Sequence, residues 1–232
     1  MGGIHSLGFE KFKILGRACL DFVYPPFCFF CDQRLSGEEL FICTDCWSNL
    51  PVLKSTLAKP ENSGKYHFIE ALAVWEYGDN VDIIIHHFKY YGKTKIGRVL
   101  GRKMGTLADE IPGYANSDCL IPVPLHRRKY RERGFNQSRI LADAVGKVLN
   151  IPVLCNVLKR IRYTKPQASL NKTKRAKNVA NAFKVVDLKA VSEKQVILID
   201  DVFTTGSTLN VCAKELLQAG AAKVRVLTVA RA

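Results

Sequence analysis

One stretch near the end of the chain restricts the fold more than any other part of it. Residues 196–199 are four consecutive apolar residues, and Asp200 and Asp201 follow them directly. An unbroken apolar run is typical of a parallel strand that is covered on both faces. After a short turn, residues 208–219 carry apolar side chains at helical spacing, and residues 223–229 have the pattern of another strand. This order of strand, helix and strand predicts a parallel α/β sheet.

The turn between the acidic pair and the helix has the composition of a phosphate-binding turn. It consists of Thr204, Thr205, Gly206, Ser207 and Thr208. In open parallel sheets, ligands bind beyond the carboxyl ends of the strands, and N–H groups at the start of a helix favour an anion. The two carboxylates would repel a phosphate, so they suit sugar hydroxyls or a divalent cation. The segment therefore predicts a ribose 5-phosphate site; the alternative is a helix cap rich in threonine and serine.

The preceding part of the chain supplies further elements for this sheet. Strands are predicted at residues 68–77, 118–123 and 152–154, and helices at residues 80–90, 94–109 and 140–149. A basic turn is predicted at residues 125–134. Residues 159–182 are polar and basic, and they are too many for a simple connector, which is typical of a functional loop.

Four of the eight cysteines form two close pairs, Cys28 with Cys31 and Cys43 with Cys46. Two thiolates three positions apart can hold one ion from a tight turn, and two such turns complete a tetrahedral shell of four sulfurs. We therefore predict a Zn²⁺ site, and a structural one, because four sulfurs leave no open position for water. The alternative is four unrelated core or redox cysteines. The other cysteines stand singly in apolar surroundings and are predicted to be buried.

These patterns divide the chain into three parts. We expect a helix at residues 8–23 and the cysteine pairs to form a module over residues 1–53, residues 54–66 to be a linker, and residues 67–232 to be the α/β domain. No stretch of about 18 apolar residues could span a membrane. The apolar start is interrupted by charged residues and has no cleavage site, so we expect a cytoplasmic protein.

The net charge of +14 comes almost entirely from one segment. Residues 127–184 hold 16 basic and two acidic residues, whereas the parts before and after this segment are close to neutral. This concentration favours a polyanionic ligand, either a polyphosphate compound or a nucleic acid or both. Tyr130, Phe135 and Tyr163 lie among the basic residues, where they could stack on bases or serve in ordinary packing. A solvated charged face is the alternative for the segment as a whole.

Several motifs together resemble a known family. Residues 196–208 are similar to the phosphoribosyl-pyrophosphate (PRPP) motif of type I phosphoribosyltransferases, and the remainder resembles the ComF branch, the competence-linked proteins of bacterial DNA uptake. The residues that carry this resemblance are the four-cysteine knuckle, Phe88-Lys89-Tyr90 with Gly92, Pro122-Val123-Pro124, Arg131-x-Arg133-Gly134-Phe135-Asn136-Gln137-Ser138, Gln167 with Leu170, and Arg175-x-x-Asn178 with Phe183.

The resemblance implies a role for each part of the site. The fold would be a type I phosphoribosyltransferase-like parallel sheet flanked by helices, with a small N-terminal zinc-binding module. Asp200 and Asp201 would take the ribose hydroxyls, directly or through water on Mg²⁺, and would be the catalytic residues of any transfer. Residues 204–208 would bind the 5-phosphate. Candidates for the pyrophosphate are His126, Arg127 and Arg128, with Arg175 and Lys177 as clamps from a mobile loop at residues 159–182.

The resemblance and the basic segment 127–184 together leave three versions of the function open. The first is a PRPP-binding competence protein of DNA uptake and natural transformation that binds single-stranded DNA on the cytoplasmic side. The second is a genuine phosphoribosyltransferase of nucleotide salvage that uses PRPP and an unidentified acceptor. The third is an adaptor whose zinc module recruits a helicase or channel protein of the DNA-uptake machinery at the inner membrane face.

Overall fold

The chain divides into two compact units, Met1–Leu50 and Pro51–Ala232. The computed structural model describes residues 26–36, 39–53, 57–58, 66–162 and 181–232. The helix predicted at residues 8–23 lies outside these described residues. Among the helices that are described, none is long and apolar enough to cross a lipid bilayer.

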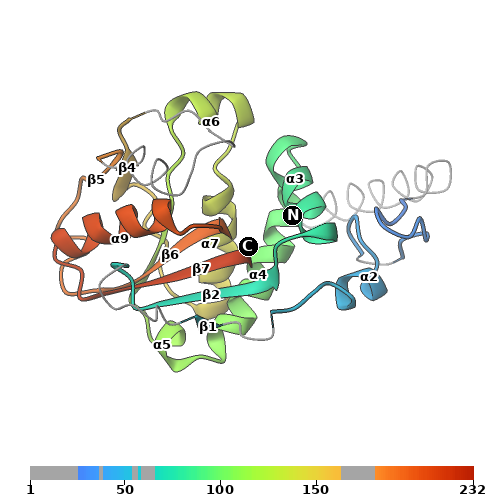
Figure 1. The fold of residues 1–232 in the computed structure, drawn as a ribbon, viewed down its shortest axis with the longest axis horizontal. Coiled ribbons are helices and arrows are strands. Elements are labelled where there is room, and N and C mark those ends of the chain that lie inside the picture. Colours follow the sequence, from blue (N-terminus) through green and yellow to red (C-terminus); the bar gives the residue numbers. More distant parts are fainter. Residues whose placement is uncertain (1–25, 37–38, 54–56, 59–65, 163–180) are drawn as a thin grey trace, which may run out of the picture. The chain divides into compact units, whose positions relative to one another are not determined.

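A five-stranded sheet forms the centre of the second unit (Figure 1). Its strands are β1 (Leu57–Ala58), β2 (Glu70–Glu76), β3 (Cys119–Pro122), β6 (Gln195–Phe203) and β7 (Lys223–Arg231). They lie in the order β1-β2-β7-β6-β3; the last four of these run parallel, and β1 pairs antiparallel with β2 at one edge. The predicted parallel sheet is confirmed. The edge strand β1 comes from the segment that was predicted as a linker.

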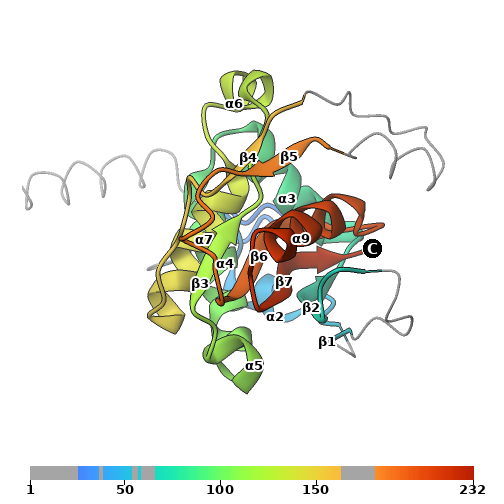
Figure 2. The same ribbon diagram turned by 90° about the vertical axis from the view of Figure 1, so that its left-hand side faces the viewer.

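Helices cover both faces of this sheet (Figure 2). The helices described in this unit are α3 (Asp79–Tyr90), α4 (Thr94–Asp109), α5 (Pro112–Ala115), α6 (Arg127–Arg133), α7 (Gln137–Leu149) and α9 (Ser207–Gln218). Helices α4 and α7 pack together on one face, and α9 lies on the other. Val196 and Leu198 of β6 share a buried cluster with Leu209 and Cys212 of α9. Because successive strand residues point to opposite faces, Ile197 and Ile199 point toward the face that α4 and α7 cover. Both faces of the strand are therefore buried, which explains the unbroken apolar run.

Glycines on α4 bring its neighbours close. A Cβ atom at Gly101 would lie 2.6 Å from the Cβ atom of Ala144 on α7, so only glycine permits this helix contact. A Cβ atom at Gly97 would collide with the ring of Phe88 on α3. Close packing on α4 therefore fixes α3 and α7, and both of these helices carry side chains of the candidate site.

The basic turn predicted at residues 125–134 is wrong, because most of it is the helix α6. His126 caps its start, since the ring Nδ1 accepts a hydrogen bond from the backbone N–H of Arg128 (3.2 Å), and Gly134 ends it in the left-handed region (φ +79°). Glu132 forms ion pairs with Arg128 (3.4 Å) and Lys129 (2.8 Å) one turn earlier. Such pairs stabilise a helix that has no buried residue, and an apolar pattern therefore could not reveal it.

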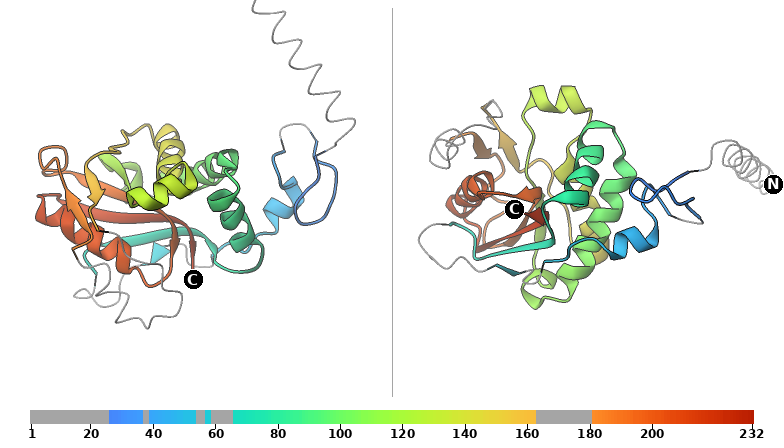
Figure 3. Two further views of the ribbon diagram at one scale, coloured as in Figure 1. Left: turned by 90° about the horizontal axis from the view of Figure 1, so that it is seen from above. Right: turned by 45° about the vertical axis from the view of Figure 1, so that its right-hand side comes forward.

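The segment around the predicted functional loop begins and ends in strands. β4 (Leu158–Arg160) and β5 (Phe183–Val185) pair antiparallel and form a small ribbon beside α9 (Figure 3). Residues 163–180 between them lie outside the described residues. The strand predicted at residues 152–154 is reduced to a single bridge between Val153 and Leu120.

Candidate functional site

Strand β6 carries the acidic pair at the carboxyl end of the sheet. The strand is longer than predicted, because its pairing with β7 continues to Phe203 opposite Arg231. The Ser138 hydroxyl at the start of α7 donates a hydrogen bond to Asp200 Oδ1 (2.9 Å), and the Asp201 backbone N–H donates to the same oxygen (2.9 Å). Asp200 is therefore held by a hydrogen bond from α7 as well as by one from its own strand.

Asp201 has a different partner. The Lys89 ammonium of α3 lies 2.8 Å from Asp201 Oδ2, and the two side chains are 21% and 15% exposed. Among the described residues, Asp200 Oδ2 and Asp201 Oδ1 accept no hydrogen bond. Each carboxylate thus keeps one oxygen available for a ligand.

The surroundings of Asp200 favour its protonated form. Burial raises the pKa of Asp200, and the neighbouring Asp201 carboxylate raises it further; the two hydrogen bonds to Asp200 and the Lys89 charge offset part of this effect. The resulting pKa is about 7. Because like charges this close cannot both be ionised at low cost, the pair is close to gaining or losing a proton at neutral pH.

The hydroxyl-rich turn leads directly from this pair into α9. Gly206 adopts the left-handed region (φ +67°), which lets the chain turn from β6 into the first residue of the helix, Ser207. Thr205 Oγ1 and Ser207 Oγ lie 2.8 Å apart. The Ser207 N–H donates to Thr205 Oγ1 across a long 3.4 Å, so the Thr205 hydroxyl caps the helix only weakly. The turn has the donors that a phosphate needs at the start of a 12-residue helix.

Three aromatic side chains, Tyr66, Phe68 and Phe203, pack together next to the turn. The ring centroids of Tyr66 and Phe68 lie 4.9 Å apart, and those of Phe68 and Phe203 lie 6.0 Å apart. The Tyr66 hydroxyl donates to the Thr205 carbonyl oxygen across 3.5 Å. A Cβ atom at Gly206 would lie 2.8 Å from the Phe203 ring. Glycine is therefore required there both for the backbone angle and for space.

The residues predicted for pyrophosphate lie at the start of α6, and none of them has a hydrogen bond or ion pair to the acidic pair among the described residues. His126 uses its ring as the helix cap, Arg128 pairs with Glu132, and Arg127 is exposed. Arg175 and Lys177 lie outside the described residues. The structure thus brings Asp200, Asp201 and residues 204–208 together, and it places His126, Arg127 and Arg128 at the start of α6.

Two of the partners at the acidic pair were not predicted as site residues. Lys89 and Ser138 occur in motifs of the resemblance, but nothing in the sequence indicated that they contact the acidic pair.

Of the predicted stacking residues, Phe135 packs against the buried Phe88 (centroids 5.9 Å apart), which is ordinary packing, whereas Tyr130 is half exposed.

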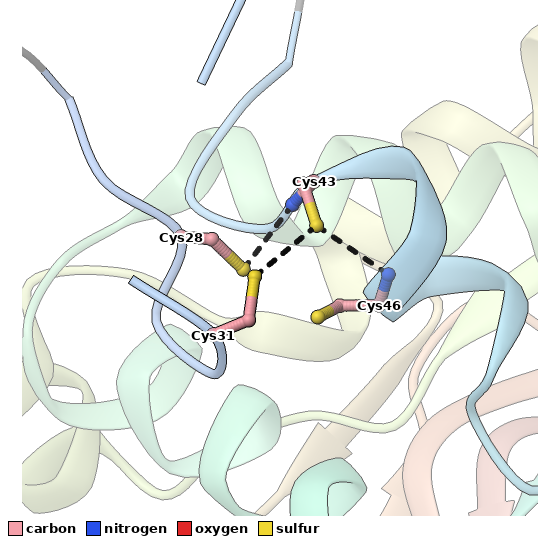
Figure 4. Close-up of side chains that lie close together, drawn as sticks. All are labelled: Cys28, Cys31, Cys43 and Cys46. Atoms are coloured by element: carbon pink, nitrogen blue, oxygen red, sulfur yellow. Dashed lines mark hydrogen bonds between the residues drawn. The ribbon is translucent and has the colours of Figure 1, made fainter. Parts of the chain in front are cut away.

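The four paired cysteines of the first unit converge (Figure 4). Their sulfur atoms all lie within 4.8 Å of one another, with Cys31 and Cys43 at 3.6 Å. The Cys43 N–H donates to Cys28 Sγ (3.4 Å), and the Cys46 N–H donates to Cys43 Sγ (3.5 Å) at the start of α2 (Thr44–Ser48). Burial raises the pKa of Cys28, but hydrogen bonds from the backbone of Cys43, Phe30 and Cys31 outweigh burial and lower it to about 6. This donor set suits a tetrahedral zinc ion.

Comparison with known proteins agrees with both units. Residues 19–58 match a family model for a double zinc ribbon domain, and residues 136–232 match one for a phosphoribosyl transferase domain. Competence protein F of Haemophilus influenzae is 34% identical over 170 residues, which cover 72% of this chain and 70% of that protein. DNA utilization protein YhgH of Escherichia coli K12 is 31% identical (69% and 71% covered), and competence protein ComFC of Bacillus subtilis is 28% identical (82% and 72% covered). The chain therefore belongs to the ComF family, as a phosphoribosyltransferase-like protein with an N-terminal four-cysteine zinc-binding cluster.

Proposed function

We propose that this protein binds PRPP at the carboxyl end of β6 and acts in bacterial DNA uptake. The observation that carries the proposal is the continuity of residues 200–208. Two carboxylates with open oxygens, which suit ribose hydroxyls, stand directly before a turn of hydroxyls and N–H groups, which suits a phosphate. A sugar phosphate is the ligand class that needs both sets at once.

The acidic pair also fits the magnesium ion that commonly accompanies pyrophosphate. Mg²⁺ binds proteins through one or two carboxylates and completes its shell with water and substrate phosphates. Asp200 and Asp201 each offer one open oxygen for this purpose. When bound, Mg²⁺ would neutralise charge on the pyrophosphate. His126, Arg127 and Arg128, and beyond the described residues Arg175 and Lys177, are our candidates for the remaining phosphate contacts.

Single-stranded DNA is the second ligand that we propose. Relatives of the chain carry the names competence protein and DNA utilization protein, and the charge of the segment 127–184 exceeds what one PRPP molecule requires. Arg127 and Arg131 are exposed on α6, where a phosphodiester backbone could reach them. We place this activity in the cytoplasm, because free thiols that bind metal belong to a reducing compartment, and we propose uptake helicase or channel proteins as partners.

Transfer of the phosphoribosyl group is a further candidate, favoured by the match of residues 136–232 to the phosphoribosyl transferase domain. Asp200 and Asp201 would then stabilise positive charge that develops on the ribose ring. Pyrophosphate release with a panel of nucleobases tests this version.

The PRPP proposal is tested by calorimetry with two site variants and two matched controls. Asp201→Asn removes a charged acceptor and Thr205→Val removes a phosphate donor; each should weaken PRPP binding about tenfold or more, in line with about 1–3 kcal/mol for such a contact. Asp143→Asn and Thr106→Val make the same changes on exposed positions of α7 and α4 and should leave the affinity unchanged. Equal affinity in all four variants would place PRPP elsewhere.

A further inference from the structure

Lys89 is held at the acidic pair by a rigid part of the fold. The preceding residue, Phe88, is completely buried; its ring fits against Gly97 of α4 and lies 5.9 Å from the ring of Phe135. The following residue, Tyr90, carries the Arg133 guanidinium over its ring at 5.0 Å from the centroid. Contacts on both sides of Lys89 thus fix this end of α3, and the lysine reaches Asp201 from a fixed backbone.

The ammonium group has more hydrogen-bonding capacity than Asp201 uses. It carries three N–H donors, and among the described residues only Asp201 Oδ2, at 2.8 Å, engages it. With 21% of its surface exposed, the side chain is partly shielded but remains accessible from the site. A compact ammonium can donate to a carboxylate and to a phosphate oxygen at the same time.

A charge argument gives this arrangement a role. A sugar phosphate that approaches Asp200 and Asp201 brings negative charge toward two carboxylates, so its binding requires a cation between them. A divalent ion is one solution, and Lys89 already places a positive charge against Asp201. We propose that Lys89 is a ligand-binding residue that supplies this charge from the chain itself, so that an anionic pentose phosphate binds without an obligatory divalent cation. The inference rests on the function proposed above.

Calorimetry with PRPP in two buffers of equal ionic strength tests the proposal, one with EDTA and one with excess Mg²⁺, and metal analysis after each titration confirms that the zinc content is the same in both. The wild-type protein should bind in EDTA with a Kd within about tenfold of its Kd in Mg²⁺. Lys89→Met should weaken binding more than tenfold in EDTA and clearly less in Mg²⁺, because the ion replaces the lost charge. Lys95→Met is the matched control, since Lys95 is exposed on α4. Lys89→Arg retains the charge and should bind better in EDTA than Lys89→Met.

The outcomes separate this inference from the function on which it rests. Absence of PRPP binding by the wild-type protein in both buffers contradicts the proposed function and the inference together. Wild-type binding that occurs only with Mg²⁺, or an equal EDTA-to-Mg²⁺ ratio of Kd in wild type and Lys89→Met, overturns the inference alone. Thermal unfolding of each variant shows that it is folded. Should Lys89→Met not fold, the wild-type Kd in the two buffers still decides, because wild-type binding that needs Mg²⁺ overturns the inference.

Discussion

At the scale of single residues, the acidic pair is asymmetric. Asp200 is held by neutral donors, the Ser138 hydroxyl and a backbone N–H, whereas Asp201 meets the charge of Lys89. Burial, reinforced by the neighbouring Asp201 carboxylate, raises the pKa of Asp200 to about 7 despite these two hydrogen bonds. Because Asp200 is partly protonated near neutral pH, the pair carries less than two full negative charges. Its oxygens can still accept hydrogen bonds from sugar hydroxyls.

Asp200 should make the stability of the protein depend on pH. The pKa is about 7 in the folded chain and about 3.9 in an unfolded one, so the folded state resists ionisation, and wild-type stability should fall as the pH rises from about 4 to 7. Asp200→Asn keeps the Oδ1 acceptor but cannot ionise. It should match wild type near pH 4 and be more stable at pH 8, by at most about 4 kcal/mol. Urea unfolding across this range measures the difference.

The control for this prediction is Asp143→Asn, which changes an exposed aspartate on α7 and should show no such trend. Parallel pH profiles for Asp200→Asn and wild type would show that Asp200 is not the group responsible.

Contiguous site residues could be predicted from the sequence, and distant ones could not. Asp200, Asp201 and residues 204–208 follow one another, so a strand and a helix start suffice to bring them together. Ser138 is 62 positions from Asp200, and its contact depends on how α7 packs on the sheet. Lys89 depends in the same way on the packing of Phe88 into the space left by Gly97.

At the scale of elements, an apolar pattern predicted the helices and strands that contribute to the core, and errors arose where tertiary pairing or charge decides. Helix α6 lacks buried residues and is stabilised by ion pairs, so it was missed. Strand β6 extends through Asp200 and Asp201, which have low strand propensity, because β7 continues beside it. The order of strands in the sheet is likewise a property of packing that local patterns do not contain.

The four-cysteine element should depend on its metal. Cys43→Ser removes one of the four sulfur ligands. The same sulfur accepts a hydrogen bond from the Cys46 N–H at the start of α2. We therefore expect loss of about one zinc ion per chain. Since metal binding contributes to folding in such small modules, the first unit should become more sensitive to proteolysis. Metal analysis and limited proteolysis measure both effects. Cys155→Ser is the matched control, because Cys155 lies outside the cluster. Wild-type protein without stoichiometric zinc would contradict the prediction.

At the scale of the whole molecule, both proposed ligands are anions that would draw on one basic segment. The chain is nearly neutral outside residues 127–184, so the attraction for a polyanion is concentrated there. PRPP needs a few cations near β6, and DNA needs a row of them along its backbone. Residues that serve both ligands would make the two compete, and separate residues would let both bind.

The salt dependence of DNA binding tests whether this segment is the binding surface. Each neutralised phosphate of a single strand contributes a slope of about −0.7 to the dependence of log K on log salt concentration. Replacement of Lys172, Lys174, Arg175 and Lys177 by glutamine should therefore weaken binding and flatten the slope by up to about 3. The matched control replaces four basic residues of α4 (Lys95, Arg98, Arg102 and Lys103), which are all exposed, and should change the slope less. Fluorescence anisotropy with a labelled oligonucleotide at several salt concentrations measures both variants.

Equal effects of the two replacements would mean that net charge alone attracts the strand. Absence of wild-type binding at low salt would assign the charge to PRPP and solvent, and it would favour the transferase version over DNA handling.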